Sequence, residues 1–398
     1  MRTIAVVGFS LAGLRATETL RRLGFDGRLV VIGAEPHLPY DRPPLSKQLL
    51  AGDADADDVV LRRQGIDDLD LEVRTGTRAT RLDVAALTLD LDDGDRVAFD
   101  GLVLATGSTP RALPDQPELE GLYTLRTLDD ALAIRAALDR GPRVVVVGAG
   151  FIGAEVAATC RGRGLDVTVL EGLAQPMVRG LGPVLGDVCA RLHRDHGVDL
   201  RLSTAVAGIE GTTRVEGVRL GDGTFVPADV VVVGIGVRPA TDWLEGSGLT
   251  IADGVVADET CLAAPGIVVA GDVARWPNPL FDGESMRLEH WTNATEQGVH
   301  AAHRLLAGDD GGEPFAPVPF VWSDQYDVKM QTVGRVSADA EMRVLHGSID
   351  ERKFVAAFGA GGRVVGALGF TMPRQVMAVR RLIAERASWD DALATATV

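Results

Sequence analysis

Cysteine and lysine are scarce in this chain. The 398 residues include three cysteines, and three of the 40 basic side chains are lysines. Cys160, Cys189 and Cys261 are scattered, with no C-x-x-C pair and no cluster of metal ligands, so neither a disulfide framework nor a zinc site is expected. This cysteine usage fits a cytoplasmic protein best, and no metal is predicted.

Long apolar segments and an excess of basic charge are also missing. The apolar stretches are interrupted by charged residues such as Glu155 and Arg238, so we expect no membrane span. The first predicted strand begins at Thr3, which leaves no room for a cleavable signal. The formal net charge is -16, so there is no broad basic surface for nucleic acid or an anionic membrane.

Glycine, by contrast, is abundant. The 47 glycines exceed average usage, and several stand at strand ends, where a ligand or another backbone comes close. A chain of 398 residues is long for one hydrophobic core, so two or three domains are predicted.

Residues 143 to 171 contain a complete dinucleotide-binding unit. Four consecutive valines predict a buried strand that runs into Gly148-x-Gly150-x-x-Gly153. These glycines allow a tight turn, close approach of a pyrophosphate and close packing of the next helix. A second strand ends at Glu171, where a carboxylate would bind the ribose 2′-hydroxyl of NADH and repel the 2′-phosphate of NADPH.

Residues 3 to 35 repeat this plan. The turn reads Gly8-x-Ser10-x-x-Gly13, and Glu35 follows the second strand. Ser10 places a side chain where the pyrophosphate comes closest, although its hydroxyl can bond a phosphate instead. We predict a second dinucleotide site here, while a βαβ unit without a ligand stays open from this stretch alone.

A stiff, proline-rich loop follows at residues 36 to 47. It holds four prolines within nine residues, which keeps its backbone out of a central strand or helix. Arg42 and Lys47 are candidates for holding a phosphate and polarising a ring, although a solvated basic residue would explain either one alone.

Two apolar strands are predicted to end in ligand-binding turns. The first stops at Ala105-Thr106-Gly107, which brings backbone amides and a small hydroxyl to a ligand. The second, residues 230 to 233, is followed by Gly234-x-Gly236 and echoes the first.

A later strand and helix offer two further contacts. The strand ends at Asp272, whose carboxylate could accept a hydrogen bond from a ribityl hydroxyl. The helix that begins near Thr292 has a partial positive charge at its N-terminus, which would suit a ring that becomes anionic on reduction, as a flavin does.

Taken together, these segments resemble one known family. The motifs are GFSLAG, PYDRPPLSK, ATGSTPR, GAGFIGAE, GVRPATDWL, GIVVAGD, EHWTNATEQG and the run from Phe320 to Tyr326. Over nearly the whole chain, they resemble the FAD-dependent, NADH-using ferredoxin reductases that serve bacterial oxygenases and cytochromes P450. The resemblance implies an α/β fold with two Rossmann-like dinucleotide-binding domains, glutathione-reductase-like, and a C-terminal α+β interface domain.

The resemblance and a predicted linker near residues 308 to 319 together give the domain boundaries. The FAD-binding domain is predicted to be discontinuous, and the C-terminal domain to close with a helix from about Arg374. The predicted ranges are 1–110 and 237–318 for FAD, 111–236 for NAD and 319–398 for the interface domain. The last range holds ten basic against nine acidic residues, so basic charge is relatively concentrated there.

The resemblance also implies roles for individual residues. The residues expected to line FAD are Gly8, Ser10, Gly13, Glu35, Arg42, Lys47, Ala105, Thr106, Gly107, Asp272 and Trp291. Those expected to contact NADH are Gly148, Gly150, Ile152, Gly153, Glu155, Glu171 and Gly236. Lys47 and Glu155 resemble the family's catalytic ion pair beside the flavin N5, and Trp322 resembles the interface-domain tryptophan near the ring.

The predicted reaction is hydride transfer from NADH to FAD, followed by one-electron delivery to a [2Fe-2S] ferredoxin that feeds an oxygenase or cytochrome P450. Residues 34 to 60 contain no cysteine, which disfavours disulfide and peroxide reduction. Two alternatives stay open: a two-electron reductase of a quinone or small oxidised metabolite, and a redox-sensing flavoprotein that acts as a binding module. The protein is expected to be a monomer or a homodimer.

Overall fold

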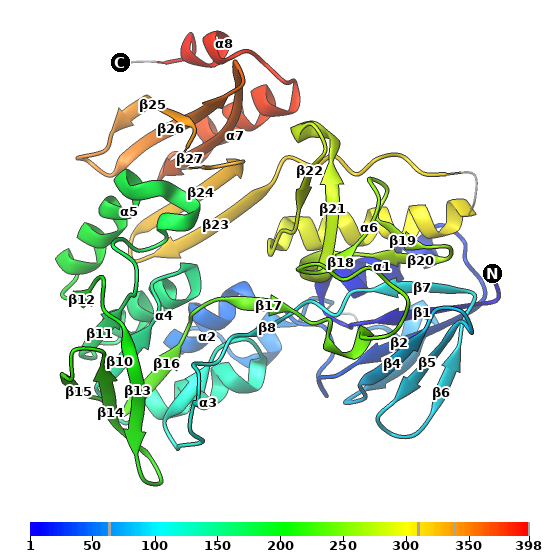
Figure 1. The fold of residues 1–398 in the computed structure, drawn as a ribbon, viewed down its shortest axis with the longest axis horizontal. Coiled ribbons are helices and arrows are strands. Elements are labelled where there is room, and N and C mark those ends of the chain that lie inside the picture. Colours follow the sequence, from blue (N-terminus) through cyan, green and yellow to red (C-terminus); the bar gives the residue numbers. More distant parts are fainter. Residues whose placement is uncertain (63–64, 309–310, 338, 397–398) are drawn as a thin grey trace. The chain divides into compact units, whose positions relative to one another are not determined.

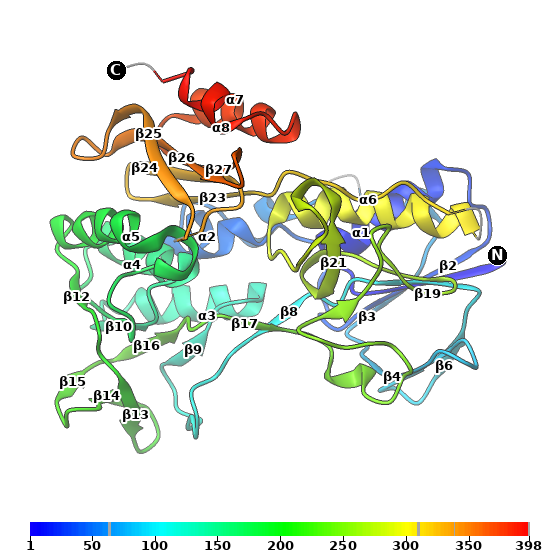
Figure 2. The same cartoon turned by 45° about the horizontal axis from the view of Figure 1, so that its top comes forward.

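The computed structural model describes residues 1–62, 65–308, 311–337 and 339–396, which belong to two compact units (Figures 1 and 2). Unit 1 comprises Met1–Asp41, Val60–Thr109 and Arg238–Phe320, and unit 2 comprises Arg42–Val59, Pro110–Val237 and Val321–Val398. Strands β8 (Ser108–Pro110) and β17 (Val237–Pro239) include two of the points where the chain passes from one unit to the other. The three predicted domain ranges stay a prediction beside these two units.

Unit 1 is built on a six-stranded sheet with the order β19-β20-β7-β1-β2-β3. Its strands are β19 (Leu262–Ala264), β20 (Ile267–Val269), β7 (Gly101–Leu104), β1 (Thr3–Val7), β2 (Arg28–Gly33) and β3 (Glu72–Thr75). All neighbours pair in parallel except β19 and β20. Both faces of a parallel sheet are normally covered, which explains the nearly continuous apolar sequences of β1, β2 and β7.

Alternate residues of this sheet bury two different cores. Ile4 and Val6 point to the face covered by α1 (Leu11–Arg22) and α6 (Trp291–Ala307). Ala5 and Val7 point to the other face, which is covered by two small sheets. These sheets consist of β4 (Ala79–Asp83), β5 (Thr88–Leu91) and β6 (Arg96–Ala98), and of β18 (Val255–Val256), β21 (Ala274–Asn278) and β22 (Glu284–Met286).

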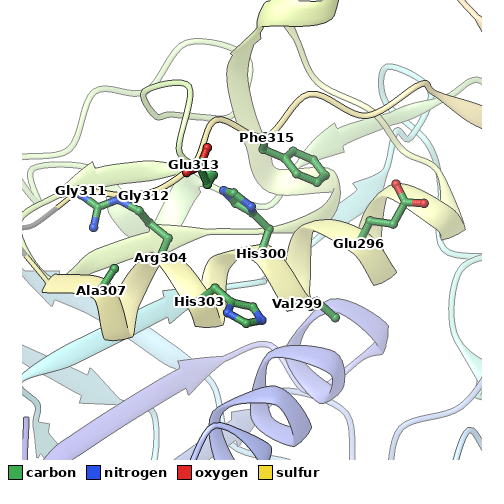
Figure 3. A pocket seen from close by; sticks show the side chains of 10 residues that line it. All are labelled: Glu296, Val299, His300, His303, Arg304, Ala307, Gly311, Gly312, Glu313 and Phe315. Carbon is green, nitrogen blue, oxygen red and sulfur yellow. The ribbon is translucent and has the colours of Figure 1, made fainter. Parts of the chain in front are cut away.

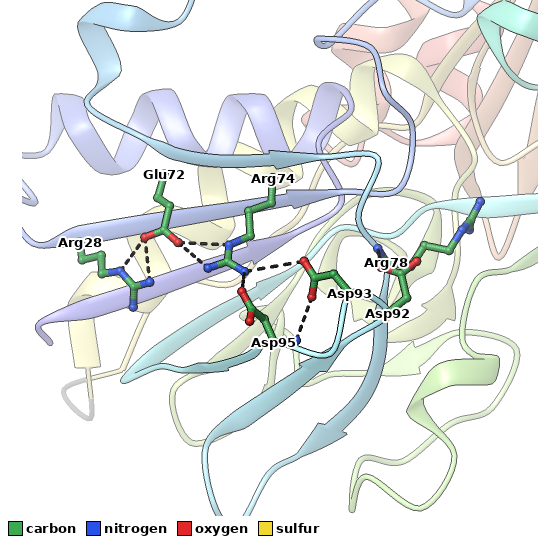
Figure 4. A network of polar contacts seen from close by, with 7 residues as sticks. All are labelled: Arg28, Glu72, Arg74, Arg78, Asp92, Asp93 and Asp95. Carbon is green, nitrogen blue, oxygen red and sulfur yellow. Dashed lines mark hydrogen bonds and ion pairs between the residues drawn. The ribbon is translucent and has the colours of Figure 1, made fainter.

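Charged side chains connect the edge of the large sheet to the β5–β6 hairpin (Figure 4). Glu72 on β3 accepts hydrogen bonds from Arg28 on β2 at 2.8 Å and from Arg74 at 2.8 Å, and Arg74 also pairs with Asp95 at 2.8 Å. Arg74 and Arg28 lower the pKa of Glu72. Such exposed pairs individually contribute little free energy, so we assign this network to positioning the hairpin.

Unit 2 contains a second parallel sheet, with the order β12-β11-β10-β16-β9. Its strands are β12 (Asp199–Arg201), β11 (Val167–Leu170), β10 (Val144–Val147), β16 (Val230–Val233) and β9 (Leu122–Thr124). Val144 and Val146 face α3 (Leu128–Leu138) and α4 (Phe151–Gly162). Val145 and Val147 face the small sheet of β13 (Val206–Gly211), β14 (Val215–Leu220) and β15 (Phe225–Pro227).

A five-stranded antiparallel sheet completes unit 2. Its order is β23-β24-β27-β26-β25, with β23 (Phe320–Gln325), β24 (Val328–Gly334), β27 (Arg363–Phe370), β26 (Lys353–Ala360) and β25 (Glu341–Ser348). One face packs on α5 (Val178–Asp195), which bends at Gly182-Pro183, and the sheet also carries α7 (Pro373–Ala384) and α8 (Trp389–Leu393). The remaining helices are α2 (Gln48–Ala51) and the 3-10 turns Pro43–Ser46, Ala56–Val59, Asp67–Leu69, Asp242–Leu244, Gly271–Val273 and Pro279–Phe281.

The structure confirms the predicted fold class and adds three elements that the sequence analysis did not name. Residues 112–130 contain β9 and the start of α3, whose N-terminus is held by a reciprocal hydrogen-bonded box between Thr127 and Asp130. The C-terminus has α8 after the predicted helix, with Ser388 as its cap. Within the described part of the chain, no helix is long and apolar enough to cross a membrane.

Candidate functional site

The two glycine turns have the same construction. Gly8 and Gly148 follow β1 and β10 with φ of +105° and +97°, a conformation that favours glycine. A Cβ on Gly8 would lie 2.1 Å from the Ala105 carbonyl oxygen, and one on Gly148 would lie 2.5 Å from the Gly234 carbonyl oxygen. Each turn therefore lies directly against the neighbouring strand end that the sequence singled out.

The last glycine of each turn lets a helix start close to the turn itself. A Cβ would lie 1.9 Å from the Gly8 carbonyl oxygen at Gly13, and 2.1 Å from the Gly148 carbonyl oxygen at Gly153. Neither position therefore has room for a side chain. The resulting helices, α1 and α4, both begin three residues after the first glycine and leave their first amides without intrahelical partners.

The middle position of each turn tests whether a dinucleotide fits. At Gly150 an added Cβ would meet nothing within 4 Å, so open space lies beside the first amides of α4. Amides at a helix N-terminus beside open space are suited to a phosphate, so the turn at Gly150 fits the predicted dinucleotide. Ser10, the equivalent residue, begins α1 with extended backbone, and its hydroxyl is not used to cap the helix.

The two acids at the strand ends are held by nearby groups. Glu171, directly after β11, accepts hydrogen bonds from the amides of Ala149 at 2.7 Å and Leu173 at 2.8 Å. Glu35 accepts a short hydrogen bond from the Tyr40 hydroxyl. A carboxylate can accept about four hydrogen bonds, so the two amides leave Glu171 with capacity for a ribose hydroxyl.

Other predicted FAD residues of unit 1 gather at the ends of β7 and β20. Thr106 donates to the Ala240 carbonyl at 3.0 Å. Asp272, in the turn after β20, accepts a hydrogen bond from Ser108 at 2.7 Å. Ser108 was not predicted, although it lies within the ATGSTPR motif.

The N-terminus of α6 carries unsatisfied polar groups, as expected where a polar ligand binds. Trp291 donates its indole N–H to Asp41 at 2.6 Å. The side-chain oxygens of Asn293 and Thr295 and the Nδ1 of His290 are buried without a hydrogen-bond partner. Burial lowers the pKa of His290 to about 4, so this ring is neutral at pH 7. Buried polar atoms rarely stay unsatisfied, so these three fit a ligand such as FAD.

The predicted ion pair is present in unit 2. Lys47, at the end of the proline-rich loop, lies 2.7 Å from Glu155 Oε2, and the two side chains are 13% and 3% exposed. Lys47 also donates to the Pro43 carbonyl at 3.0 Å, so the stiff loop orients its ammonium group. Glu155 accepts further hydrogen bonds from the hydroxyls of Ser46 and Ser323.

Four remaining predicted residues differ in their surroundings. Arg42 donates to the Arg126 carbonyl at 2.6 Å, so part of its guanidinium is already engaged. Ile152, in the first turn of α4, is 46% exposed, which is unusual for isoleucine and leaves it accessible to a ligand. Gly236 has φ of +100° with open space beside it, and Trp322 is half-buried on β23.

Other possible reactive centres are poorly suited to chemistry. All three cysteines are buried, which raises the pKa of each thiol to about 12 and makes a reactive thiolate unfavourable. Within the described ranges, no group of three or more His, Cys, Asp or Glu side chains could hold a metal ion.

A separate hollow of about 760 Å³ runs along α6 and contains none of the predicted site residues (Figure 3). Its lining includes His300, His303 and Arg304. Arg304 already donates to Thr260 at 2.8 Å and to the Gly308 carbonyl at 2.7 Å. The predicted site residues lie outside this hollow, at the glycine turns and at the Lys47–Glu155 pair.

Comparison with known proteins identifies the family. Residues 2–298 match the pyridine nucleotide-disulphide oxidoreductase family, and residues 320–397 match the reductase C-terminal domain. The chain belongs to the pyridine nucleotide-disulphide oxidoreductase family. The predicted family and its cofactors, FAD and NAD(H), are thereby confirmed.

Within this oxidoreductase family, the similar proteins include reductases of oxygenase systems. The chain is 38% identical to rhodocoxin reductase of Rhodococcus erythropolis, covering 96% of this chain and 89% of the relative. It is 39% identical to the ferredoxin–NAD(+) reductase component of the anthranilate 1,2-dioxygenase system of Burkholderia cepacia, covering 97% and 95%.

Two solved structures extend the likeness to the whole oxidoreductase fold. Putidaredoxin reductase, from its covalent complex with putidaredoxin, has a TM-score of 0.91 at 33% identity and covers 97% of this chain and 93% of its own. The ferredoxin reductase for the CYP199A2 system of Rhodopseudomonas palustris has a TM-score of 0.90 at 33% identity, with full coverage of both chains.

Proposed function

We propose that this protein is an FAD-dependent NADH:ferredoxin oxidoreductase that passes electrons singly to a [2Fe-2S] ferredoxin serving an oxygenase or cytochrome P450. The observation that carries the proposal is the combination of two dinucleotide turns of the same construction with three buried, unreactive thiols. A chain of this family without a reactive dithiol has no internal route for disulfide reduction, so electrons would leave from the flavin.

The residues would divide the work of binding. The turn at Gly8, Ser10 and Gly13 would hold the FAD pyrophosphate on the amides of α1. Asp272 would accept a hydrogen bond from a hydroxyl of the ribityl chain. The N-terminus of α6, with its partial positive charge, would lie toward the flavin ring. Arg42, Ala105, Thr106, Gly107 and Trp291 complete the proposed FAD residues, together with Glu35.

The second turn would hold NADH. Gly148, Gly150 and Gly153 would bring its pyrophosphate to α4, and Glu171 would bind the adenosine ribose. Ile152 and Gly236 would contact the coenzyme through their exposed positions. When bound, FAD supplies the conversion between a two-electron donor and a one-electron acceptor.

Lys47 and Glu155 are the proposed catalytic residues. A buried ammonium group beside the ring would favour negative charge as it arrives there. Glu155 would neutralise and orient that ammonium group before the coenzyme binds. In this proposal the pair supplies charge and orientation, and no side chain has to act as a proton donor.

The experiment that tests this function is anaerobic NADH oxidation by the FAD-loaded protein, with and without a [2Fe-2S] ferredoxin. We expect slow oxidation alone and fast oxidation after the ferredoxin is added. Equal turnover with a quinone in place of the ferredoxin, or with dioxygen in a separate aerobic assay, would contradict the proposal. A cytoplasmic location and a monomeric or homodimeric state complete the proposal, and both can be checked on the purified protein and in cell fractions.

A further inference from the structure

A chain of buried polar side chains runs from Glu155 into the interior of unit 2. Ser323 donates its hydroxyl proton to Glu155 Oε1 at 2.6 Å, and Gln325 Nε2 lies 3.2 Å from the Ser323 hydroxyl. His193 Nε2 lies 3.0 Å from Gln325 Oε1, and His193 Nδ1 lies 2.9 Å from the Tyr326 hydroxyl. Glu155, Ser323, Gln325 and His193 are all at most 3% exposed.

Three elements bring these groups together. Glu155 stands on α4, His193 stands in the last turn of α5, and Ser323 and Gln325 stand two residues apart on β23. Residues two apart in a strand point to the same face, which places both of these side chains toward the helices. Tyr326 directly follows β23 with φ of +56° and stacks on His196 at 3.6 Å.

The hydrogen-bond donors of this chain all point one way. An ionised carboxylate cannot donate, so the single proton of Ser323 goes to Glu155. Ser323 must then accept from the Gln325 amide nitrogen, which leaves the amide oxygen facing His193. His193 therefore carries its proton on Nε2, and its Nδ1 accepts from Tyr326.

The state of His193 agrees with this direction. Burial lowers the pKa of its imidazole to about 4, so the ring is neutral at pH 7 and carries its single proton on one of the two ring nitrogens. Each donor in a one-directional chain polarises the next, which strengthens the final bond to the carboxylate. Burying three polar side chains is costly unless each is satisfied, and here every one has a partner.

We propose that Ser323, Gln325 and His193 are positioning residues that hold the Glu155 carboxylate in the orientation needed to pair with Lys47. This inference rests on the proposed function, because it assigns the network to the pair that acts at the flavin. The C-terminal sheet would then have a second role besides packing on α5. Through β23, it would orient the Glu155 carboxylate toward Lys47, although neither charged residue belongs to the sheet.

The first test reads the network without any turnover. In the FAD-loaded protein labelled with ¹⁵N-histidine, His193 is assigned by its loss in His193→Gln. We expect its Nε2 to have the shift of a protonated ring nitrogen and its Nδ1 that of an unprotonated one, with a changed Nε2 shift in Gln325→Met. Protonation on Nδ1 would reverse the chain and overturn the proposal.

The second test asks whether the network acts through Glu155. Stopped-flow reduction of the bound FAD by saturating NADH should be roughly threefold to tenfold slower in Ser323→Ala and in Gln325→Met, as expected for one lost hydrogen bond. FAD content should be unchanged. In a Glu155→Gln background, the same substitutions should have no further effect, because the charge they orient is gone.

A matched control separates positioning from general weakening. Ser388→Ala also removes a serine hydrogen bond in the C-terminal part of the chain, at the cap of α8, and should reduce flavin at the wild-type rate. Additive losses in the Glu155→Gln background would make the network purely structural and overturn the proposal. If Glu155→Gln itself reduces normally while the histidine tautomer is as expected, the proposed role of the pair at the flavin fails, and the positioning role fails with it.

Discussion

Replacing Lys47 by methionine tests the catalytic pair through both stability and rate. Methionine keeps much of the length of lysine but removes the charge and the 2.7 Å bond to Glu155. The carboxylate would keep two hydroxyl donors, Ser46 and Ser323, but no cation. Removing one partner of a buried ion pair typically lowers folding stability by ~3–5 kcal/mol. Because the two hydroxyls still donate to Glu155, we expect the loss in Lys47→Met to be near the lower end of this range.

The same substitution should slow the chemical step. One oriented charge at a site without water contributes ~2–4 kcal/mol to the transition state, which corresponds to roughly 30- to 1,000-fold in rate. We expect Lys47→Met to bind FAD fully and to be reduced by NADH more slowly by this factor. Stopped-flow absorbance of the flavin measures the rate, and denaturant unfolding followed by circular dichroism measures the stability.

The double variant separates the two effects. Adding Glu155→Gln to Lys47→Met removes the uncompensated charge, so most of the lost stability should return while flavin reduction stays slow. If Lys47→Met and Glu155→Gln each hold full FAD and are reduced at the wild-type rate, the pair is structural and the reasoning is refuted.

Three further predictions concern the coenzyme, the partner and pH. Glu171 should make the enzyme prefer NADH over NADPH by at least roughly tenfold in kcat/KM, as expected for one charge-assisted hydrogen bond, and equal efficiencies would refute its role. Charge reversal at Arg380 and Arg381 together should slow ferredoxin reduction at low salt but not dye reduction, because steering between exposed charges is screened by salt; an unchanged rate would place docking elsewhere. Burial lowers the pKa of His193 in the folded protein to about 4, whereas in the unfolded chain it is about 6.5. As pH falls below about 6.5, His193 is therefore protonated in the unfolded chain but stays neutral in the folded protein, which favours unfolding. This should lower the free energy of unfolding by about 2 kcal/mol by pH 5. Replacing His193 by glutamine should reduce this pH dependence of unfolding. The control His303→Gln, at an exposed histidine, should leave it unchanged.

The dinucleotide turns could be predicted because their geometry is encoded locally. Gly8 and Gly148 each stand five residues before the last glycine of their turn, and the backbone requirements of such turns are met within that short segment. The buried strands before them were equally clear, because Val144 to Val147 have no polar residue. Such local patterns predict structure reliably because the residues that determine the conformation are close together in the sequence.

The contacts around the carboxylate could not be predicted in the same way. Glu155 accepts hydrogen bonds from Ser46 and Ser323, which are 109 and 168 residues away in the sequence. No sequence periodicity connects such distant positions. A family resemblance pointed to the partner Lys47, whereas His193 lies in no motif. Strand β9 was missed for a related reason, since three residues are too few to show a pattern and its pairing with β16 decides its conformation.

The most direct measurement is the stoichiometry of a single anaerobic turnover with a [2Fe-2S] ferredoxin. NADH is added in limiting amount to the FAD-loaded protein with excess oxidised ferredoxin, and the spectra of both proteins are followed. The account predicts two equivalents of reduced ferredoxin per NADH, formed one after the other. No reduction of any ferredoxin in a panel, with rapid two-electron reduction of a quinone instead, would contradict it.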